Sequence, residues 1–431
     1  MRFSALPGFR DVFPDALARR RRIFSAWRMV AERYGFQEYD GPPLEPLELY
    51  TAKSGEEIAG QLYEFEDKGG RRVALRPEMT PTLARMVGSR AAQLRKPIRW
   101  YSIPQLFRYE RQQRGRLREH FQLNVDVIGE PGPAADAEVI AVAIDIMREL
   151  GLGPGDVRVR LSDRRILADL LSGDLGVREA ELPAVLSALD RWEKSREAAA
   201  EAIRGVLGGD AERSGEVLKL VEELGAPEPW LGRESAGALR ECLTHLEAMG
   251  KREWVDVDFR IVRGLAYYTG IVFELFDAGR SLRAICGGGR YDSLIKSFGG
   301  PDLPCVGFGM GDVVLGELLA EKGLAAVRQT AVDVFVALVR EEERAEALKL
   351  AARLRDRGSR VEYPLRKMQL GKQLELANDR GAKWVVIIGP DEIGSGKVRV
   401  RQMGTGVERV MEIEAMMEEL EAQRRSGGDG E

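Results

Sequence analysis

Arginines are crowded into one short stretch of the chain, residues 100–130, which reads WYSIPQLFRYERQQRGRLREHFQLNVDVIGE. Residues two apart in a strand project from the same face, so a strand here would hold Arg108 and Glu110 side by side. A polar loop would carry the remaining arginines, Arg111, Arg114, Arg116 and Arg118. Because a guanidinium can bind two phosphate oxygens at once, this stretch predicts an enzyme that handles phosphates or nucleic acid. The alternative is a solvated hairpin with ordinary surface arginines.

The composition is typical of a globular protein with two or three domains, since 44% of the 431 residues are hydrophobic and 31% are charged. The longest apolar stretches, such as Trp384–Ile388, are only strand-sized, so no transmembrane helix is expected. The N-terminal residues lack the apolar core of a secretory signal and the length of a transit peptide, which favours the cytoplasm. The formal net charge of −4 argues against a protein that coats nucleic acid non-specifically, although a local basic strip could still bind a specific RNA.

Three cysteines, Cys242, Cys286 and Cys305, are widely spaced and form no CxxC pair. The chain has only two histidines, His120 and His245, to complete a metal site. A zinc site or a disulfide framework is therefore not expected, and the cysteines are predicted to be buried thiols.

Helical and strand-like patterns alternate through the first 150 residues. Apolar residues recur at helical spacing over Arg19–Tyr34, and strand-like and turn segments follow as far as Gly129. The next pattern predicts a helix over Asp136–Leu150, with Asp136 as its N-cap and Gly151 marking its end.

From about Ile166 to Gly250 the sequence becomes helical and highly charged, which we interpret as an inserted helical domain. Strands and glycine turns return from Val255. A helix over Val313–Leu324 is then predicted to close this part of the chain.

A third region, from about residue 329, alternates strands with helices. Strands are expected at VDVFVALV, SRVEY, AKWVVIIGPDEI, Lys397–Met403 and Val407–Ile413, and helices at Glu341–Arg357 and Gly371–Arg380. This alternation predicts right-handed βαβ crossovers and a parallel or mixed sheet, as in any small α/β domain. The tail, residues 425–431, is expected to be disordered.

The arginine-rich stretch resembles motif 2 of class II aminoacyl-tRNA synthetases, and its GRxRExxQ pattern is similar to that of the histidyl-tRNA synthetase family. A second block, VRGLAYYTGIVFELF at Val262–Phe276, resembles the histidine-binding signature of that family. Three further blocks match in the expected order, namely PGFRDVFP (Pro7–Pro14), ALRPEMT (Ala74–Thr80) and CGGGRYDSLIKSFGG (Cys286–Gly300). The resemblance covers nearly the whole chain.

The resemblance implies an α+β fold. Residues 1–328 would form a class II catalytic domain on an antiparallel sheet, with the helical insertion at about 166–250. Residues 329–424 would form an α/β anticodon-binding domain. Pro42 matches the proline of motif 1, whose segment forms the dimer interface in class II enzymes, so a homodimer is implied.

The resemblance also implies which residues bind histidine. Glu78 and Gln122 would hold the α-ammonium group, and Asp126 and Tyr268 would contact the imidazole. The full set is Glu78, Met79, Thr80, Gln122, Asp126, Arg263, Tyr267 and Tyr268. Tyr267 and Tyr268 adjoin in an expected strand and so would point to opposite faces, which means that one of them could be merely packing.

The nucleotide site is implied in the same way. Arg108 and Arg263 would be the catalytic residues, because cations must be preorganised around the α-phosphate as charge develops there. The implied ATP-binding residues are Arg108, Glu110, His120, Phe121 and Arg290, with Mg²⁺ accompanying the phosphates and no metal held by the protein itself. The run GGGRYD would pack close to the adenylate, although a plain tight turn is as compatible with its local sequence. Arg114 and Arg116 would contact tRNA.

Three residues depart from the family pattern. Ala266 replaces an aspartate after RGL, and Val314 stands where motif 3 usually carries an arginine that touches ATP. His120 falls where the family commonly has a phenylalanine that stacks on adenine, and either His120 or the adjacent Phe121 could supply the ring. The sequence RGLAYYTGIVFE, together with the missing motif 3 arginine, resembles a subgroup that includes plant organellar enzymes.

The activity that the resemblance implies is histidine–tRNA ligation, with L-histidine, ATP and tRNA(His) as substrates and no binding to DNA or membranes. The alternative is the regulatory subunit of ATP phosphoribosyltransferase, a histidine-sensing paralogue without catalysis. That paralogue generally lacks the C-terminal domain, whereas about a hundred residues of α/β sequence follow the catalytic unit here.

Overall fold

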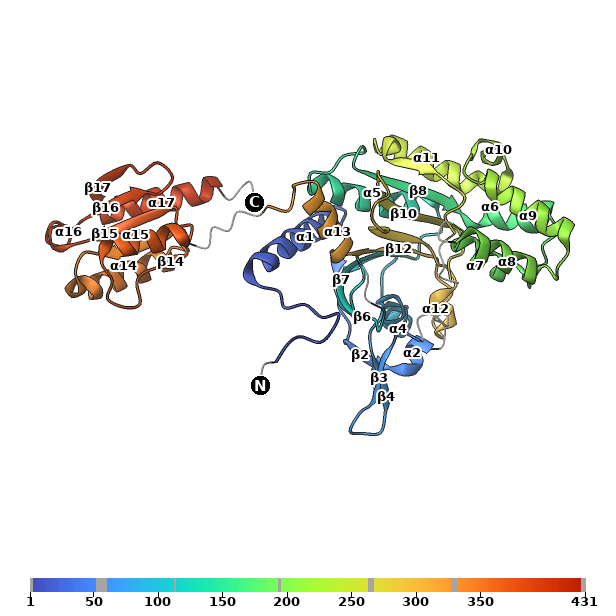
Figure 1. Cartoon of the computed structure of the whole chain (residues 1–431), viewed down its shortest axis with the longest axis horizontal. Helices are drawn as coiled ribbons and strands as arrows, with labels where there is room; N and C mark the ends of the chain where they lie inside the picture. The colour runs from blue at the N-terminus through green and yellow to red at the C-terminus, as the bar shows by residue number, and fades with distance from the viewer. Residues whose placement is uncertain are drawn as a thin grey trace. The chain divides into compact units, whose positions relative to one another are not determined.

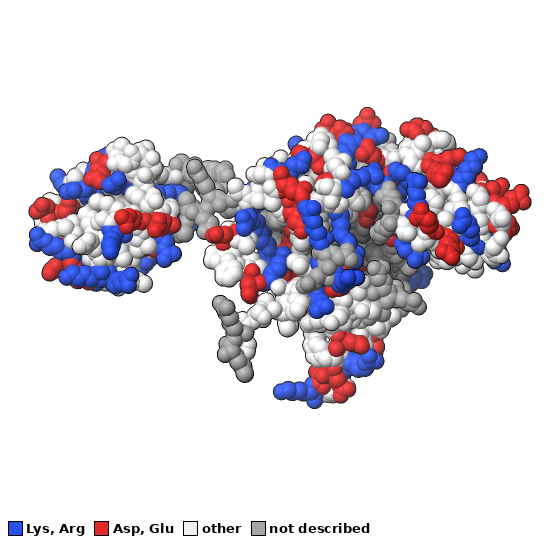
Figure 2. Space-filling view, in the orientation of Figure 1, with Lys and Arg blue, Asp and Glu red and all other residues white. Residues whose placement is uncertain are grey.

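The chain divides into two compact units, Met1–Ala326 and Val327–Glu431, close to the boundary predicted at residues 328 and 329. The computed structural model describes residues 3–51, 60–111, 114–192, 195–262, 267–326 and 332–427, and only the backbone of Ile393 and of 424–427. No described helix is long and apolar enough to cross a membrane. Basic and acidic side chains alternate over the visible face of each unit (Figure 2).

The first unit is built on a nine-stranded sheet (Figure 1). Its order is β1-β5-β7-β12-β11-β10-β8-β9, and β6 pairs with β7. The central strands are antiparallel, while β1 pairs with β5 and β9 with β8 in parallel. The strands are β1 (Gln37–Glu38), β5 (Ile98–Ser102), β6 (Gln105–Phe107), β7 (Glu119–Ile128), β8 (Val157–Asp163), β9 (Val255–Val257), β10 (Ile271–Asp277), β11 (Cys286–Arg290) and β12 (Cys305–Gly311). A smaller sheet contains β2 (Leu44–Pro46), β4 (Arg72–Leu75) and β3 (Tyr63–Glu66).

Three helices cover one face of the large sheet: α1 (Pro14–Arg33), α5 (Pro133–Glu149) and α13 (Asp312–Glu321). The sequence of α5, PAADAEVIAVAIDIMRE, is apolar nearly all round, as expected for a helix buried between the sheet and other helices. Trp27 of α1, Ile140 of α5 and Leu123 of β7 are fully buried in this core. On the other face, α4 (Thr80–Arg90) and α12 (Leu294–Ser297) pack in a second cluster with Val272 and Tyr291, and α2 (Leu47–Thr51) packs against α4.

The predicted N-cap of α5 is wrong. The helix begins three residues earlier, at Pro133 after Gly132, because the fixed φ of proline suits a first helical position. The side chain of Asp136 is therefore not needed for capping and bonds to Arg290 instead. The end of the helix is as predicted, with Gly151 in the left-handed region at φ 89°.

A run of short helices follows β8 and corresponds to the predicted insertion. The members are α6 (Arg164–Ala168), the π-helix η1 (Asp169–Asp174), α7 (Leu182–Asp190), α8 (Arg196–Val206), α9 (Ala211–Glu223), α10 (Glu228–Leu231), η2 (Glu234–Ala236) and α11 (Gly237–Ala248), followed by η3 (Arg252–Trp254). Side chains cap two of these helices: Asp163 accepts from the backbone N–H group of Arg165 at the start of α6, and Asp210 accepts from those of Glu212 and Arg213 at the start of α9. Helix α11 packs directly on α5, so the insertion shares the core of the sheet.

The second unit is a five-stranded mixed sheet of order β14-β13-β15-β16-β17, as predicted from the alternating pattern. The strands are β13 (Val334–Leu338), β14 (Val361–Glu362), β15 (Trp384–Ile388), β16 (Lys397–Gln402) and β17 (Glu408–Glu412). The helices are η4 (Glu341–Glu343), α14 (Arg344–Asp356), α15 (Leu370–Asp379), α16 (Pro390–Ser395) and α17 (Ile413–Gly427). Helix α17 includes residues 425–427, which were predicted to belong to the disordered tail, and the rest of that tail lies outside the described residues.

Candidate active site

The centre of the large sheet has a face without side chains, formed by glycines of β11 and β12. In the sequence CVGFGMG of β12, Val306, Phe308 and Met310 enter the core, so Gly307 and Gly309 lie on the opposite face. They pair with Gly289 and Gly287 of β11, and directly opposite residues in an antiparallel pair share a face. We call these four residues the glycine floor. The run GGGRYD is therefore mostly a central strand and not a turn.

Gln122 and Asp126 of β7 extend over the glycine floor. A Cβ atom added to Gly307 would lie 2.1 Å from Oδ1 of Asp126, and one added to Gly309 would lie 2.7 Å from Nε2 of Gln122. Only glycine leaves room for both polar side chains to lie flat on the next strand. The sheet thus brings together two of the predicted histidine-binding residues.

The same alternation along β7 separates His120 from Phe121. His120 shares the face of Gln122 and Asp126, because residues two apart project together. Phe121 lies on the helix-covered face, with its ring 5.2 Å from that of Phe24 and 4.6 Å from Cζ of Arg20. The structure therefore does not support the predicted role of Phe121 at adenine. Burial, and after it the nearby Arg108, lowers the pKa of His120 to about 3, so its ring is neutral.

Asp126 is a buried carboxyl group that accepts a hydrogen bond from the hydroxyl of Tyr291. Burial raises its pKa to about 7, and the bond from Tyr291 opposes the shift only in part. Tyr291 and its partner Asp126 are 165 residues apart in the sequence, so no local pattern shows that they meet. The pair forms a buried acceptor at the edge of the glycine floor.

Arg108 connects motif 2 with the start of α4, where Glu78, Met79 and Thr80 lie. Its Nε donates to the carbonyl of Pro77 at 2.9 Å, next to the buried Glu78. The predicted strand holding Arg108 and Glu110 is wrong, because β6 ends at Phe107 and both residues lie in the following loop. They still approach one another, with Nη1 of Arg108 4.0 Å from Oε1 of Glu110.

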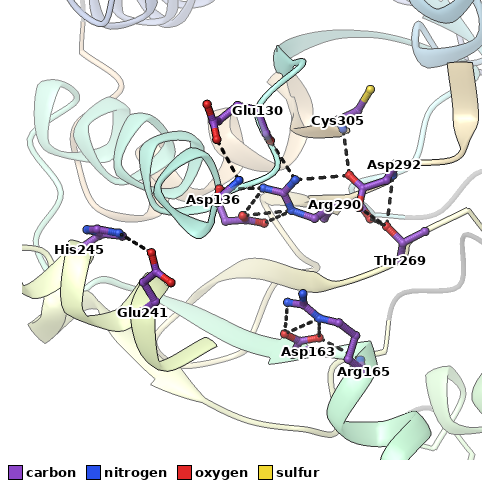
Figure 3. A network of polar contacts seen from close by, with 11 residues as sticks. Glu130, Asp136, Asp163, Arg165, Glu241, His245, Thr269, Arg290, Asp292 and Cys305 are labelled. Carbon is purple, nitrogen blue, oxygen red and sulfur yellow. Dashed lines mark hydrogen bonds and ion pairs between the residues drawn. The ribbon is translucent and has the colours of Figure 1, made fainter. Parts of the chain in front are cut away.

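Arg290 is committed to contacts within the protein (Figure 3). Its Nε donates to Asp136, Nη1 to the carbonyl of Glu130 and to Asp292, and Nη2 to the carbonyl of Gly132 and to Asp136. A guanidinium has five N–H groups, and all five are used in this way. The predicted binding of ATP by Arg290 is therefore not supported, and its role is to position β11 against α5.

The family follows from comparison with known proteins. The histidyl-tRNA synthetase family pattern matches residues 8–311. The chain belongs to the histidyl-tRNA synthetase family. An anticodon binding domain pattern matches residues 333–423, which lie in the second unit. The α+β class II fold predicted from the sequence is thereby confirmed.

Relatives of this histidyl-tRNA synthetase family member align over nearly its full length. A histidine–tRNA ligase of Opitutus terrae is 48% identical over 416 residues, which are 94% of this chain and 95% of that protein. A chloroplastic and mitochondrial histidine–tRNA ligase of Arabidopsis thaliana is 39% identical over 93% of this chain and 83% of that protein, which confirms the predicted likeness to plant organellar enzymes. The crystal structure of a histidyl-tRNA synthetase from Nostoc has a TM-score of 0.81 at 26% identity, covering 98% of this chain and all of that one.

The tyrosines of the family signature differ from their predicted placement. Tyr267 and Tyr268 precede β10 and are not in a strand, so the predicted alternation of a strand does not apply to them. Their ring centroids are 5.1 Å apart, and that of Tyr267 is 6.0 Å from that of Tyr291. Both belong to one aromatic cluster beside the Tyr291–Asp126 pair. Arg263 and Ala266 lie outside the described residues.

The motif 2 loop is attached to the motif 3 helix of this synthetase fold. Arg114, predicted to bind tRNA, forms ion pairs with Glu317 and Glu321 of α13, and its Nε is 3.3 Å from Oε2 of Glu317. Arg116, the other predicted tRNA contact, lies 2.9 Å from Oε2 of Glu110. The structure therefore places both arginines against carboxylates.

Cys242, Cys286 and Cys305 are buried and form no disulfide, as predicted for buried thiols. Within the part of the chain that the structure describes, no three His, Cys, Asp or Glu side chains are grouped as metal ligands would be.

Replacing Asp126 by asparagine is expected to stabilise the protein most at neutral and alkaline pH. The pKa of Asp126 is about 7 in the folded state, against an ordinary value of 3.8. Between these values the folded protein holds a proton that the unfolded chain has lost, so the wild type loses stability as the pH rises from 3.8 to 7. Asparagine has no charge to bury. The free energy of unfolding of Asp126→Asn, relative to that of the wild type, should therefore increase by about 2–3 kcal/mol between pH 5 and pH 8.

Urea unfolding of wild type and Asp126→Asn at pH 5 and pH 8 measures this difference. Asp11→Asn is the control, because Asp11 is exposed. If the difference in the free energy of unfolding between Asp126→Asn and wild type were the same at both pH values, the raised pKa of Asp126 would be contradicted.

Proposed function

We propose that this protein is a histidine–tRNA ligase, which activates L-histidine with ATP and transfers it to tRNA(His). The observation that carries the proposal is the family match over residues 8–311, supported by the buried Asp126 above the glycine floor. An imidazole ring needs a hydrogen-bond acceptor for its N–H group, and a buried carboxylate is a strong one.

The first step is formation of histidyl-adenylate. A carboxylate oxygen of histidine attacks the α-phosphorus of ATP, the bond from that phosphorus to the bridging oxygen breaks, and pyrophosphate leaves. Arg108 and Arg263 stabilise the charge that develops on the α-phosphate, and Mg²⁺ accompanies the phosphates. Glu78 and Gln122 hold the α-ammonium group, with Met79 and Thr80 beside them. These assignments are supported by the hydrogen bond from Arg108 to the carbonyl of Pro77, the residue next to Glu78.

In the second step a hydroxyl oxygen of the terminal adenosine of tRNA(His) attacks the activated carbonyl carbon. AMP leaves, and the hydroxyl proton is lost. The second unit binds the anticodon loop, whose unpaired bases are accessible to protein side chains. The enzyme acts as a homodimer in the cytoplasm and binds neither DNA nor membranes.

The deciding experiment is amino-acid-dependent exchange of pyrophosphate into ATP, with histidine compared against the other standard amino acids. Exchange with histidine alone is expected, because a site that satisfies both imidazole nitrogens leaves buried polar groups unpaired when another side chain enters. Exchange with a different amino acid would contradict the proposal.

The regulatory subunit of ATP phosphoribosyltransferase is the second candidate, since it shares the ancestry of the catalytic unit. The match of residues 333–423 to an anticodon binding domain argues against it. Histidine binding by calorimetry without any pyrophosphate exchange would favour this second function.

A further inference from the structure

The block PGFRDVFP (Pro7–Pro14) is similar to the family pattern, but the proposed function leaves it without a role. The carbonyl of Gly8 accepts a hydrogen bond from the N–H group of Arg118 at 3.0 Å. A Cβ atom added to Gly8 would lie 2.6 Å from Cγ of Arg118, so the two segments are in direct contact. The ring centroid of Phe9 is 6.5 Å from that of Phe107, the last residue of β6. The block therefore contacts residues that precede and follow the motif 2 loop.

Arg10, in the same block, connects motif 2 with motif 3. Its Nε donates to Oε1 of Glu119 at 2.6 Å, and its Nη2 lies 3.2 Å from Oδ2 of Asp312. Glu119 is the first residue of β7, and Asp312 is the first residue of α13. One guanidinium group thus holds the start of the motif 2 strand against the start of the motif 3 helix.

The second oxygen of each carboxylate binds a neighbouring strand. Oε2 of Glu119 accepts from Nε2 of Gln105 in β6 at 3.0 Å. Oδ1 of Asp312 accepts from the backbone N–H group of Phe121 in β7 at 2.9 Å. The two carboxylates therefore join β6, β7 and α13, and Arg10 lies between them.

The charges of Glu119 and Asp312 depend on Arg10. The two residues are 3% and 4% exposed. Burial raises the pKa of both carboxyl groups, and Arg10 opposes the rise in each. Arg20 also lowers the pKa of Glu119, but among the described residues only Arg10 forms an ion pair with Asp312. Without Arg10, two buried carboxyl groups would repel one another, and the contact between β7 and α13 would loosen.

The first three residues of β7 depend on this anchor because few strand contacts hold them. Among the described strands, Glu119, His120 and Phe121 pair only with β6, which has three residues. From Gln122 onward, β7 also pairs with β12. The end of β7 that carries His120 is therefore fixed largely by side chains, whereas the rest of the strand is fixed by the sheet.

We infer that Arg10 is a positioning residue for ATP, which holds His120 in place through the two carboxylates and does not touch the nucleotide. This inference rests on the proposed function, in which ATP is a substrate, and on His120 as the ring that adenine contacts. Glu119 directly precedes His120, and Phe121, whose N–H group is bound by Asp312, directly follows it. The backbone of His120 is thus held from both sides.

The test is Arg10→Gln, which removes the charge from a side chain that is 28% exposed and should leave the fold intact. The KM for ATP in histidine-dependent pyrophosphate exchange should rise about 10- to 100-fold, since a displacement of about 1 Å at the site can cost about 100-fold. The KM for histidine should stay unchanged, because Gln122 and Asp126 are held by β12. Calorimetry should show an equal loss of affinity for AMP and for a non-hydrolysable ATP analogue, because both carry adenine.

Adding Asp312→Asn to Arg10→Gln should recover most of the affinity for ATP. Asparagine keeps an oxygen for the N–H group of Phe121 but has no charge to repel Glu119. A direct contact between Arg10 and ATP could not be restored by this second change. The recovery therefore separates positioning through the carboxylates from direct binding.

Arg33→Gln is the matched control. It breaks an ion pair of similar length, 2.7 Å, between Arg33 of α1 and Glu149 of α5. Neither residue belongs to β7 or α13, so the KM values for ATP and histidine should remain those of the wild type.

An unchanged KM for ATP in Arg10→Gln would overturn the inference. An equal rise for ATP and histidine, or a variant that thermal unfolding shows to be unfolded at the assay temperature, would also overturn it, since either result gives Arg10 a general role in stability. Failure of Asp312→Asn to restore ATP binding would overturn positioning through the carboxylates. Absence of histidine-dependent exchange in the wild type is a separate result, which contradicts the proposed function itself.

Discussion

Gly307→Ala should reduce histidine-dependent pyrophosphate exchange by about 100-fold or more, because a displacement of about 1 Å in a reacting group costs that much. The added methyl group would lie 2.1 Å from Oδ1 of Asp126 and 2.6 Å from the carbonyl oxygen of Val125. The backbone oxygen is fixed in the β7–β12 ladder, so Asp126 or the strand itself must move. Either movement separates the carboxyl group from Tyr291 and displaces the acceptor proposed for the imidazole.

Gly215→Ala is the control for the general effect of adding a methyl group to a glycine. Gly215 lies inside α9 with nothing within 4 Å of an added Cβ atom, so this change should leave activity unaltered. Overpacking at Gly307 should also lower stability by about 1–3 kcal/mol, which thermal unfolding would detect. Wild-type exchange by Gly307→Ala would mean that Asp126 does not need its place on the floor.

Arg290→Met should lower the free energy of unfolding by about 3–5 kcal/mol, because it leaves the buried carboxylate of Asp136 without a partner. Asp136 and Arg290 are 1% and 3% exposed. Adding Asp136→Leu removes the unpaired charge, so the double variant should recover most of the loss. Denaturant unfolding of both variants, followed by a signal from the first unit, measures the effect.

The matched control is Lys296→Met, which breaks an ion pair with Asp302 of similar length, 2.7 Å, on the surface. Both side chains there are more than 60% exposed, so the loss should not exceed about 1 kcal/mol. The double variant Arg290→Met/Asp136→Leu also tests the role of Arg290. A stable double variant with a normal KM for ATP would support positioning, whereas a raised KM in that variant would restore the predicted contact with ATP.

Sequence motifs identified the residues of the site better than they placed them. Gln122 and Asp126 were predicted from the motif, yet their position over Gly309 and Gly307 depends on the register of β7 against β12. These strands are separated by more than 170 residues, and no local pattern encodes their register. Arg290 was predicted to bind ATP from the resemblance to the family, and its partner Asp136 is 154 residues away.

The spacing of hydrophobic residues predicted the strands and helices of the second unit well. It failed to predict where a strand ends when contacts with distant parts of the chain end it. Strands and helices of the second unit alternate with clear hydrophobic patterns, so their order and the mixed sheet followed from the sequence. At Arg108 the alternating pattern continued, but the backbone N–H of the next residue, Tyr109, donates to the carbonyl of Gln61 and not to β7.

The ion pairs of Arg114 with α13 reduce the binding free energy that RNA could gain from a contact with this arginine. Arg114 is 65% exposed, and its guanidinium already forms ion pairs with Glu317 and Glu321. A phosphate must therefore replace carboxylates, and the net gain is the difference between two ionic contacts. While these ion pairs persist, a polyanion gains little from this arginine.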